Sequence, residues 1–122
     1  MANEFKPTIG SKVSKTEAEK WIKKYDDERR KDKMKDTKSV FYGKDVLQEI
    51  INTPGASGVS FFLSLKHSSH AGKEVENLVL VPTKEDGTLI WEEAGGKDAR
   101  SPAYDDGAVC PPTCPPSATG SV

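Results

Sequence analysis

Apolar residues near the start of the chain recur with the period of an α-helix. Four of them are spaced i, i+3, i+4 and i+7: Ala18, Trp21, Ile22 and Tyr25. Ser14 and Glu17 just before them have the S-x-x-E spacing of a capping box, which predicts that the helix begins at Lys15. We expect the helix to end near residues 30–32, because the charged segment 31–38 contains a single apolar residue.

A second helix is predicted over residues 44–52. Its inward positions, which follow the helical spacing, are Val46, Leu47, Ile50 and Ile51. Pro54 and Gly55 end this helix. An extended or first-turn apolar anchor is expected just before it, formed by Val40, Phe41 and Tyr42.

From Gly58 onward the apolar period changes to 2, which is typical of a strand. The alternation predicts a half-buried strand with an apolar side made of Val59, Phe61, Leu63 and Leu65. Residues 78–81 are apolar on both faces and predict a central or partly covered strand. Pro82 either ends this strand or lies at a position where no backbone N–H is needed for strand pairing. Asp86 and Gly87 predict a tight turn into a third strand over residues 88–92.

These elements predict an α+β fold, with two N-terminal helices packed on a three-stranded antiparallel β-meander and an extended C-terminal tail. A single domain over residues 12–95 lies between an N-terminal tail, residues 1–11, and a Pro/Gly-rich C-terminal tail, residues 96–122. A domain of this size buries only about 60–65% of its unfolded surface, so dimerisation would stabilise it.

The net charge of −1 conceals an uneven distribution along the chain. Residues 6–44 carry 13 Lys or Arg against 7 Asp or Glu, and residues 45–122 carry 5 against 11. A basic face for an anionic partner and head-to-tail self-association are two interpretations, and a solvated helix with interleaved charges is the third. We favour the third and expect no nucleic-acid partner, because a patch that binds nucleic acid is usually less mixed in charge and carries stacking aromatic residues.

The first residues of the chain lack the apolar segment of a secretory signal. No apolar run approaches the roughly 18 residues that span a bilayer. We therefore expect a soluble cytoplasmic protein with no membrane partner.

The two cysteines of the chain lie in the sequence C-P-P-T-C at residues 110–114. With His67 and His70, which we place in the loop between the first two strands, Cys110 and Cys114 complete the Cys₂His₂ inventory of a tetrahedral zinc site. A zinc site, a Cys110–Cys114 disulfide and free thiols are the three interpretations. The whole hairpin between the two pairs argues against zinc, and we expect no other cofactor.

The disulfide requires a turn between the two cysteines. A polyproline II conformation would hold their Cα atoms about 12 Å apart, whereas a disulfide needs them within about 7 Å. A type VI turn with a cis bond before Pro112 is one way to close the ring. A disulfide is not expected to persist in a reducing cytosol.

No catalytic constellation stands out in the sequence. Asp45 and Glu49 are one helical turn apart, but like charges at that spacing are usually just exposed. Gly43 and Lys44 begin a helix without any phosphate-binding fingerprint. We therefore expect a protein that is not an enzyme.

Three short motifs stand out along the chain. Residues 41–47 read F-Y-G-K-D-V-L, residues 78–81 read L-V-L-V, and residues 110–114 read C-P-P-T-C. In these motifs the chain resembles a group of small uncharacterised bacterial proteins with an aromatic-Gly-basic helix start and a C-terminal C-P-P-x-C. The resemblance covers roughly residues 14–114 and implies no known activity. His67 and His70 have no counterpart in that group, which weakens the zinc interpretation further.

We therefore interpret the chain as a small binding or interaction module whose contact elements are the sheet edge and the Cys/Pro tail. Its partner would be another protein or a second copy of the chain. The alternative is a metal-binding or redox-linked protein that uses Cys110, Cys114, His67 and His70.

Overall fold

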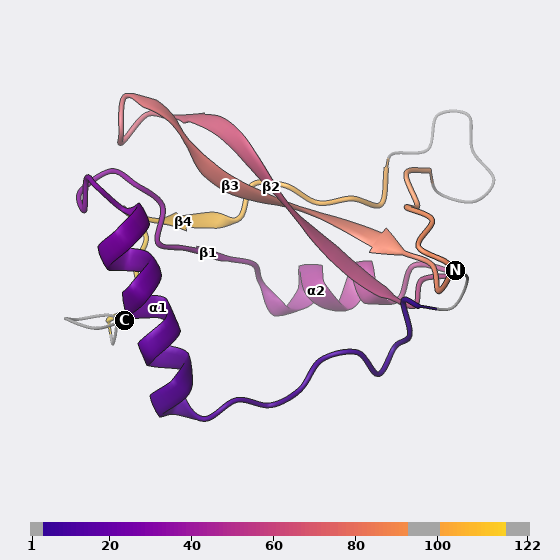
Figure 1. The fold of residues 1–122 in the computed structure, drawn as a ribbon. Helices are drawn as coiled ribbons and strands as arrows, with labels where there is room; N and C mark the ends of the chain where they lie inside the picture. The colour runs from indigo at the N-terminus through magenta and orange to yellow at the C-terminus, as the bar shows by residue number, and fades with distance from the viewer. Residues whose placement is uncertain (1–3, 93–100, 117–122) are drawn as a thin grey trace. The chain divides into compact units, whose positions relative to one another are not determined.

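The computed structural model describes residues 4–92 and 101–116. In chain order its elements are α1 (Lys15–Arg29), β1 (Ser39–Phe41), α2 (Lys44–Ile51), β2 (Gly58–Ser68), β3 (Lys73–Thr83) and β4 (Ala108–Cys110), as Figure 1 shows. The predicted α+β class is confirmed. Among these residues, neither helix has the length and apolar character needed to cross a membrane.

The strands form two sheets of two strands each. β2 and β3 pair with each other as a hairpin (Figure 1). In its turn, the Gly72 amide donates a hydrogen bond to the Ser68 carbonyl at 2.8 Å. β1 pairs antiparallel with β4, with Val40 opposite Val109. A strand thus begins inside the stretch that was expected to be an extended tail.

The predicted three-stranded meander is not confirmed. Residues 88–92 contribute an isolated bridge between Leu89 and Thr83 instead of a strand. Three residues earlier in β3, Leu80 and Tyr104 exchange two backbone hydrogen bonds, at 2.9 and 2.8 Å. The segment around Tyr104 therefore occupies the edge of β3 that a third strand would need.

The chain divides into two compact units, each built from separate pieces of sequence. The first unit comprises Met1–Gly10, Tyr42–Ser64 and Leu78–Gly107, and the second comprises Ser11–Phe41, Leu65–Asn77 and Ala108–Val122. The predicted domain boundary at residues 95 and 96 lies outside the described residues.

α1 begins and ends close to its predicted limits. The Ser14 hydroxyl accepts a hydrogen bond from the Glu17 amide at 3.1 Å, which is the predicted cap at the start of the helix. No residue of α1 is buried, and Trp21 is 58% exposed. The predicted packing of this helix on a sheet is therefore not confirmed.

α2 supplies a core residue of the first unit. Ile50 is fully buried, whereas Ile51, which was also expected to face inward, is 58% exposed. Successive side chains of a helix point about 100° apart. The side of α2 that carries Ile50 is therefore covered, while Ile51 points into solvent. The largest fully buried side chains among the described residues all belong to this unit: Ile50, Leu80, Val81 and Pro82.

β2 is a strand as predicted, but its apolar side is not the covered one. Phe61 is 56% exposed, Leu63 78% and Leu65 63%. Ser60 on the opposite side lies partly buried, and its hydroxyl is 2.7 Å from the Thr83 hydroxyl. Alternation in the sequence identifies a strand but not which of its two sides has a neighbour, and the predicted burial of the apolar side is wrong here.

Candidate functional site

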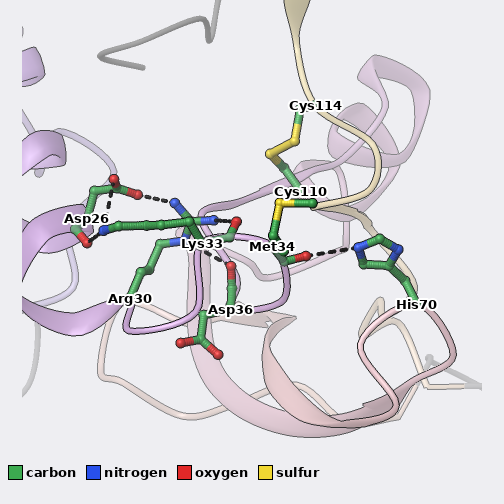
Figure 2. Close-up of a disulfide and its surroundings, with 8 residues drawn as sticks. All are labelled: Asp26, Arg30, Lys33, Met34, Asp36, His70, Cys110 and Cys114. Carbon is green, nitrogen blue, oxygen red and sulfur yellow. Dashed lines mark hydrogen bonds and ion pairs between the residues drawn. A yellow bond between two sulfur atoms is a disulfide. The ribbon is translucent and has the colours of Figure 1, made fainter.

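Cys110 and Cys114 form a disulfide in the second unit, with their Cα atoms 4.7 Å apart (Figure 2). The turn between them has cis bonds before both Pro111 and Pro112. Cys110 ends β4 and is 2% exposed, and its carbonyl accepts a hydrogen bond from the Lys38 amide at 2.7 Å. Cys114 is exposed. The disulfide therefore joins a residue held in the β1–β4 sheet to one that reaches solvent.

The two histidines lie in the β2–β3 hairpin. His67 belongs to β2, and His70 lies in the β2–β3 turn. The His70 Nε2 is 2.9 Å from the Met34 carbonyl oxygen, and Figure 2 shows its ring turned toward that oxygen. Within residues 4–92 and 101–116, no group of three or more His, Cys, Asp or Glu side chains is placed to hold a metal ion. His70 thus contacts the loop after α1.

That loop is organised around the buried Arg30 guanidinium. Arg30 is 5% exposed and donates hydrogen bonds from Nε to the Asp36 carbonyl at 2.8 Å and from Nη2 to the Lys33 carbonyl at 2.9 Å. Its Nη1 pairs with the Asp26 carboxylate, one helical turn earlier (Figure 2). Burial acts to raise the pKa of Asp26, but the Arg30 and Lys33 hydrogen bonds outweigh it, so the pKa lies below its usual value.

Asp36 connects this loop to β3. Its carboxylate accepts from the Asp32 amide at 3.0 Å and from the Lys73 ammonium at 2.8 Å. The amide first, and then Lys73, hold the pKa of Asp36 below its usual range. Several cations of the basic segment are thus paired with neighbouring carboxylates, which fits a structural role for these charges.

The first unit contains an open cavity of about 650 Å³. Its polar lining includes Glu49 and Tyr104, whose hydroxyl donates a hydrogen bond to the Glu49 carboxylate, together with Lys84 and Glu92. Asp45 and Glu49 are both exposed, as the sequence predicts, and Glu49 also accepts the hydrogen bond from Tyr104, which the sequence did not predict. That contact uses the carboxylate to fix the segment around Tyr104.

The most distinctive surface of the first unit is the edge of β2. In the part of the chain that the structure describes, β2 has one neighbouring strand, β3, on one side. Its segment Gly58–Ser64 carries no charge, and Phe61, Phe62 and Leu63 are 56, 43 and 78% exposed. We call this segment the β2 edge. Within the described residues, its outer side has no partner strand, so the segment presents the backbone groups of a sheet edge together with apolar side chains.

Comparisons of the chain with models of protein families, with curated proteins and with solved structures found no match.

Two features escaped the sequence reasoning. Arg30 lies in a run of charges that reads as a solvated surface, and only the folded loop shows that it is buried. The pairing of β4 with β1 joins segments about 70 residues apart through strands of three residues each, which are too short to show a period. The absence of charge over residues 58–65 was the one visible signal for the β2 edge.

Proposed function

We propose that the protein is a non-enzymatic interaction module that binds its partner by strand addition at the β2 edge. The observation that carries the proposal is an apolar strand with a neighbour on one side only among the described residues. The exposed residues 112–116 of the C-terminal segment are a second contact element of the same proposal.

Edge strands in natural proteins are usually blunted by charges, prolines or bulges, because their unpaired N–H and C=O groups recruit other chains. The β2 edge has no charged residue and no proline between Gly58 and Leu65. Strand addition supplies main-chain hydrogen bonds for affinity and alternate side chains for specificity. Phe61 and Leu63 are the side chains placed to select a partner.

The test compares two substitutions of equal chemistry. Phe61→Lys puts a charge on the β2 edge, and Ile51→Lys puts one on α2 in the same unit at nearly the same exposure, 58% against 56%. Proteins retained by the immobilised native chain are identified, produced in pure form, and measured against both variants. We expect Phe61→Lys to weaken binding by about tenfold or more and Ile51→Lys by less than about twofold. Equal effects of the two variants would refute the β2 edge as the contact element.

A redox-linked function is the second candidate, favoured by the unequal burial of the disulfide. Cys114 is exposed, which favours attack of a thiolate at its sulfur, whereas Cys110 is buried. In the proposed step one thiolate of a dithiol reductant attacks the Cys114 sulfur to form a mixed disulfide, and Cys110 leaves as a thiolate that takes up a proton. The second thiolate of the reductant then attacks the reductant's own sulfur in the mixed disulfide. This closes the reductant's disulfide and releases Cys114 as a thiolate that also takes up a proton.

Equilibration with glutathione buffers, followed by thiol alkylation and intact mass measurement, tests this candidate. A reversible midpoint within the range of cellular glutathione pools supports it. A disulfide that stays oxidised throughout that range, or a chain that takes up two alkyl groups without any reductant, rejects it.

A further inference from the structure

We propose that the partner of the β2 edge is a second copy of the same chain, and that two β2 strands pair antiparallel about a two-fold axis through Phe62. This inference rests on the proposed function and adds the identity of the partner. The pairing would join the two hairpins into a sheet of four strands, in the order β3, β2, β2 and β3.

The side chains of the β2 edge complement one another in this arrangement. A two-fold axis perpendicular to the sheet keeps Phe61 and Leu63 of both copies on one face. Phe61 of each copy then lies opposite Leu63 of the other, and Phe62 lies opposite its own equivalent on the other face. Cross-strand pairs of this apolar type stabilise antiparallel sheets.

Charge also favours self-pairing in this register. The five residues that pair, 60–64, are all uncharged, so no charge is buried or opposed to its own equivalent. Gly58, Val59 and Ser60 at the start of β2 line a small cavity together with Phe5 and Ile9 of the N-terminal segment. The register leaves Gly58 and Val59 unpaired and uses Ser60 only as its first residue. The middle of the strand is therefore the part that a second copy can reach.

The exposed apolar area of the β2 edge limits the size of the dimer interface. From the exposed fractions of Phe61, Phe62 and Leu63, roughly 300 Å² of side chain is available in each copy. Both copies together provide about 600 Å², which lies below the roughly 1,200 Å² of standard interfaces. We therefore expect a weak, reversible dimer that forms as concentration rises.

Sedimentation equilibrium of the native chain is the first measurement. The average mass should rise from 13.3 kDa toward twice that value between low micromolar and millimolar concentration. A native chain that stays monomeric over this range overturns the inference. That result leaves the proposed function standing, because capture of a different protein depends on the separate comparison of Phe61→Lys with Ile51→Lys.

A charge pair tests the register. Phe61→Lys and Leu63→Glu should each raise the dissociation constant of the dimer by about tenfold or more. Because of the two-fold axis, each substitution places a charge opposite an apolar side chain at two symmetry-related positions of the dimer. Their equimolar mixture should dimerise more tightly than either variant alone, because it creates one Lys–Glu pair and keeps one Phe–Leu pair. Failure of the mixture to recover dimerisation overturns this register, and undiminished dimers of the single variants overturn the surface.

Amide hydrogen exchange of the native chain tests the same interface and does not depend on the folding of a variant. Amides within residues 60–64 that face the second copy should become protected as concentration rises, while those of β1 and β4 stay unchanged. Protection that rises elsewhere and not in residues 60–64 overturns the inference.

Discussion

The Tyr25 hydroxyl donates a hydrogen bond to the Glu76 carboxylate at 2.6 Å, which links α1 to β3 across 51 positions of sequence. α1 has no buried residue, so this hydrogen bond ties the helix to β3 without the burial of a helix side chain. The hydrogen bond from Glu76, helped by partial burial, raises the pKa of Tyr25 to about 12.

Tyr25→Phe should lower the free energy of unfolding by about 1 kcal/mol, because it removes a hydrogen bond to a charged acceptor at a partly exposed site. Urea denaturation measures the change. Glu76→Gln should weaken the same contact, and the double variant should be little worse than Tyr25→Phe alone. Glu74→Gln, an exposed neighbour on β3, is the control and should change stability by less than about 0.5 kcal/mol.

The raised pKa of Tyr25 predicts a loss of stability in alkali. The folded state binds the phenolic proton more tightly than the unfolded state, whose pKa is about 10. The contribution of Tyr25 is therefore fully present below pH 10 and is lost as pH rises to about 12. The stability difference between the native chain and Tyr25→Phe should be constant up to pH 10 and then shrink. A difference that persists unchanged to pH 12 would contradict this assignment.

Arg30 predicts a large effect from a conservative substitution. Lys at this position cannot reach the Asp36 carbonyl, the Lys33 carbonyl and the Asp26 carboxylate together, so buried acceptors would lose their donors. We expect Arg30→Lys to cost about 2–3 kcal/mol of stability. Arg29→Lys next to it is exposed and should stay within about 0.5 kcal/mol of the native chain. Equal effects of the two substitutions in urea denaturation would show that the loop is not organised by Arg30.

Local chemistry explains which elements the sequence could predict. Ser14 and Glu17 are three residues apart, and their capping contact forms wherever the chain is helical. Gly87 has a φ of 92°, which glycine adopts readily, so the turn predicted at Asp86 and Gly87 is also present.

The parts that could not be predicted depend on distant neighbours. Phe61 and Leu63 alternate as a half-buried strand should, but nothing in the alternation says whether another element covers them. At Leu80 the partner of β3 is Tyr104, and residues 88–92 pair with β3 only near its end, at Thr83. Leu80 and Tyr104 are too far apart in the sequence for a local pattern to indicate their pairing. The β2 edge could be expected as a sheet edge, but its apolar exposure could not.

Reduction of the disulfide should destabilise the second unit. Closing a ring of about five residues restricts the unfolded chain by about 2 kcal/mol on the chain-entropy relation. Thermal unfolding should therefore occur at a lower temperature in the presence of a reductant. After reduction, the exposed Cys114 should be alkylated before the buried Cys110.

Cys114→Ser serves as the control for that experiment. The variant should unfold near the temperature of the reduced native chain and should not respond to reductant. An unfolding temperature of the native chain that is the same with and without reductant would show that the disulfide does not stabilise the fold.

Two serines of β2 predict opposite outcomes for the same substitution. The Ser60 hydroxyl is 2.7 Å from the Thr83 hydroxyl, whereas the buried Ser64 hydroxyl has no hydrogen-bond partner among the described residues. Ser60→Ala leaves Thr83 without that contact and should cost about 1 kcal/mol, whereas Ser64→Ala removes an unsatisfied buried group and should add about 1 kcal/mol. Because both residues lie on the same side of the strand, changes in strand propensity cancel between them. Urea denaturation of the two variants measures the difference, and a loss of stability in Ser64→Ala would mean that its hydroxyl has a partner in solution.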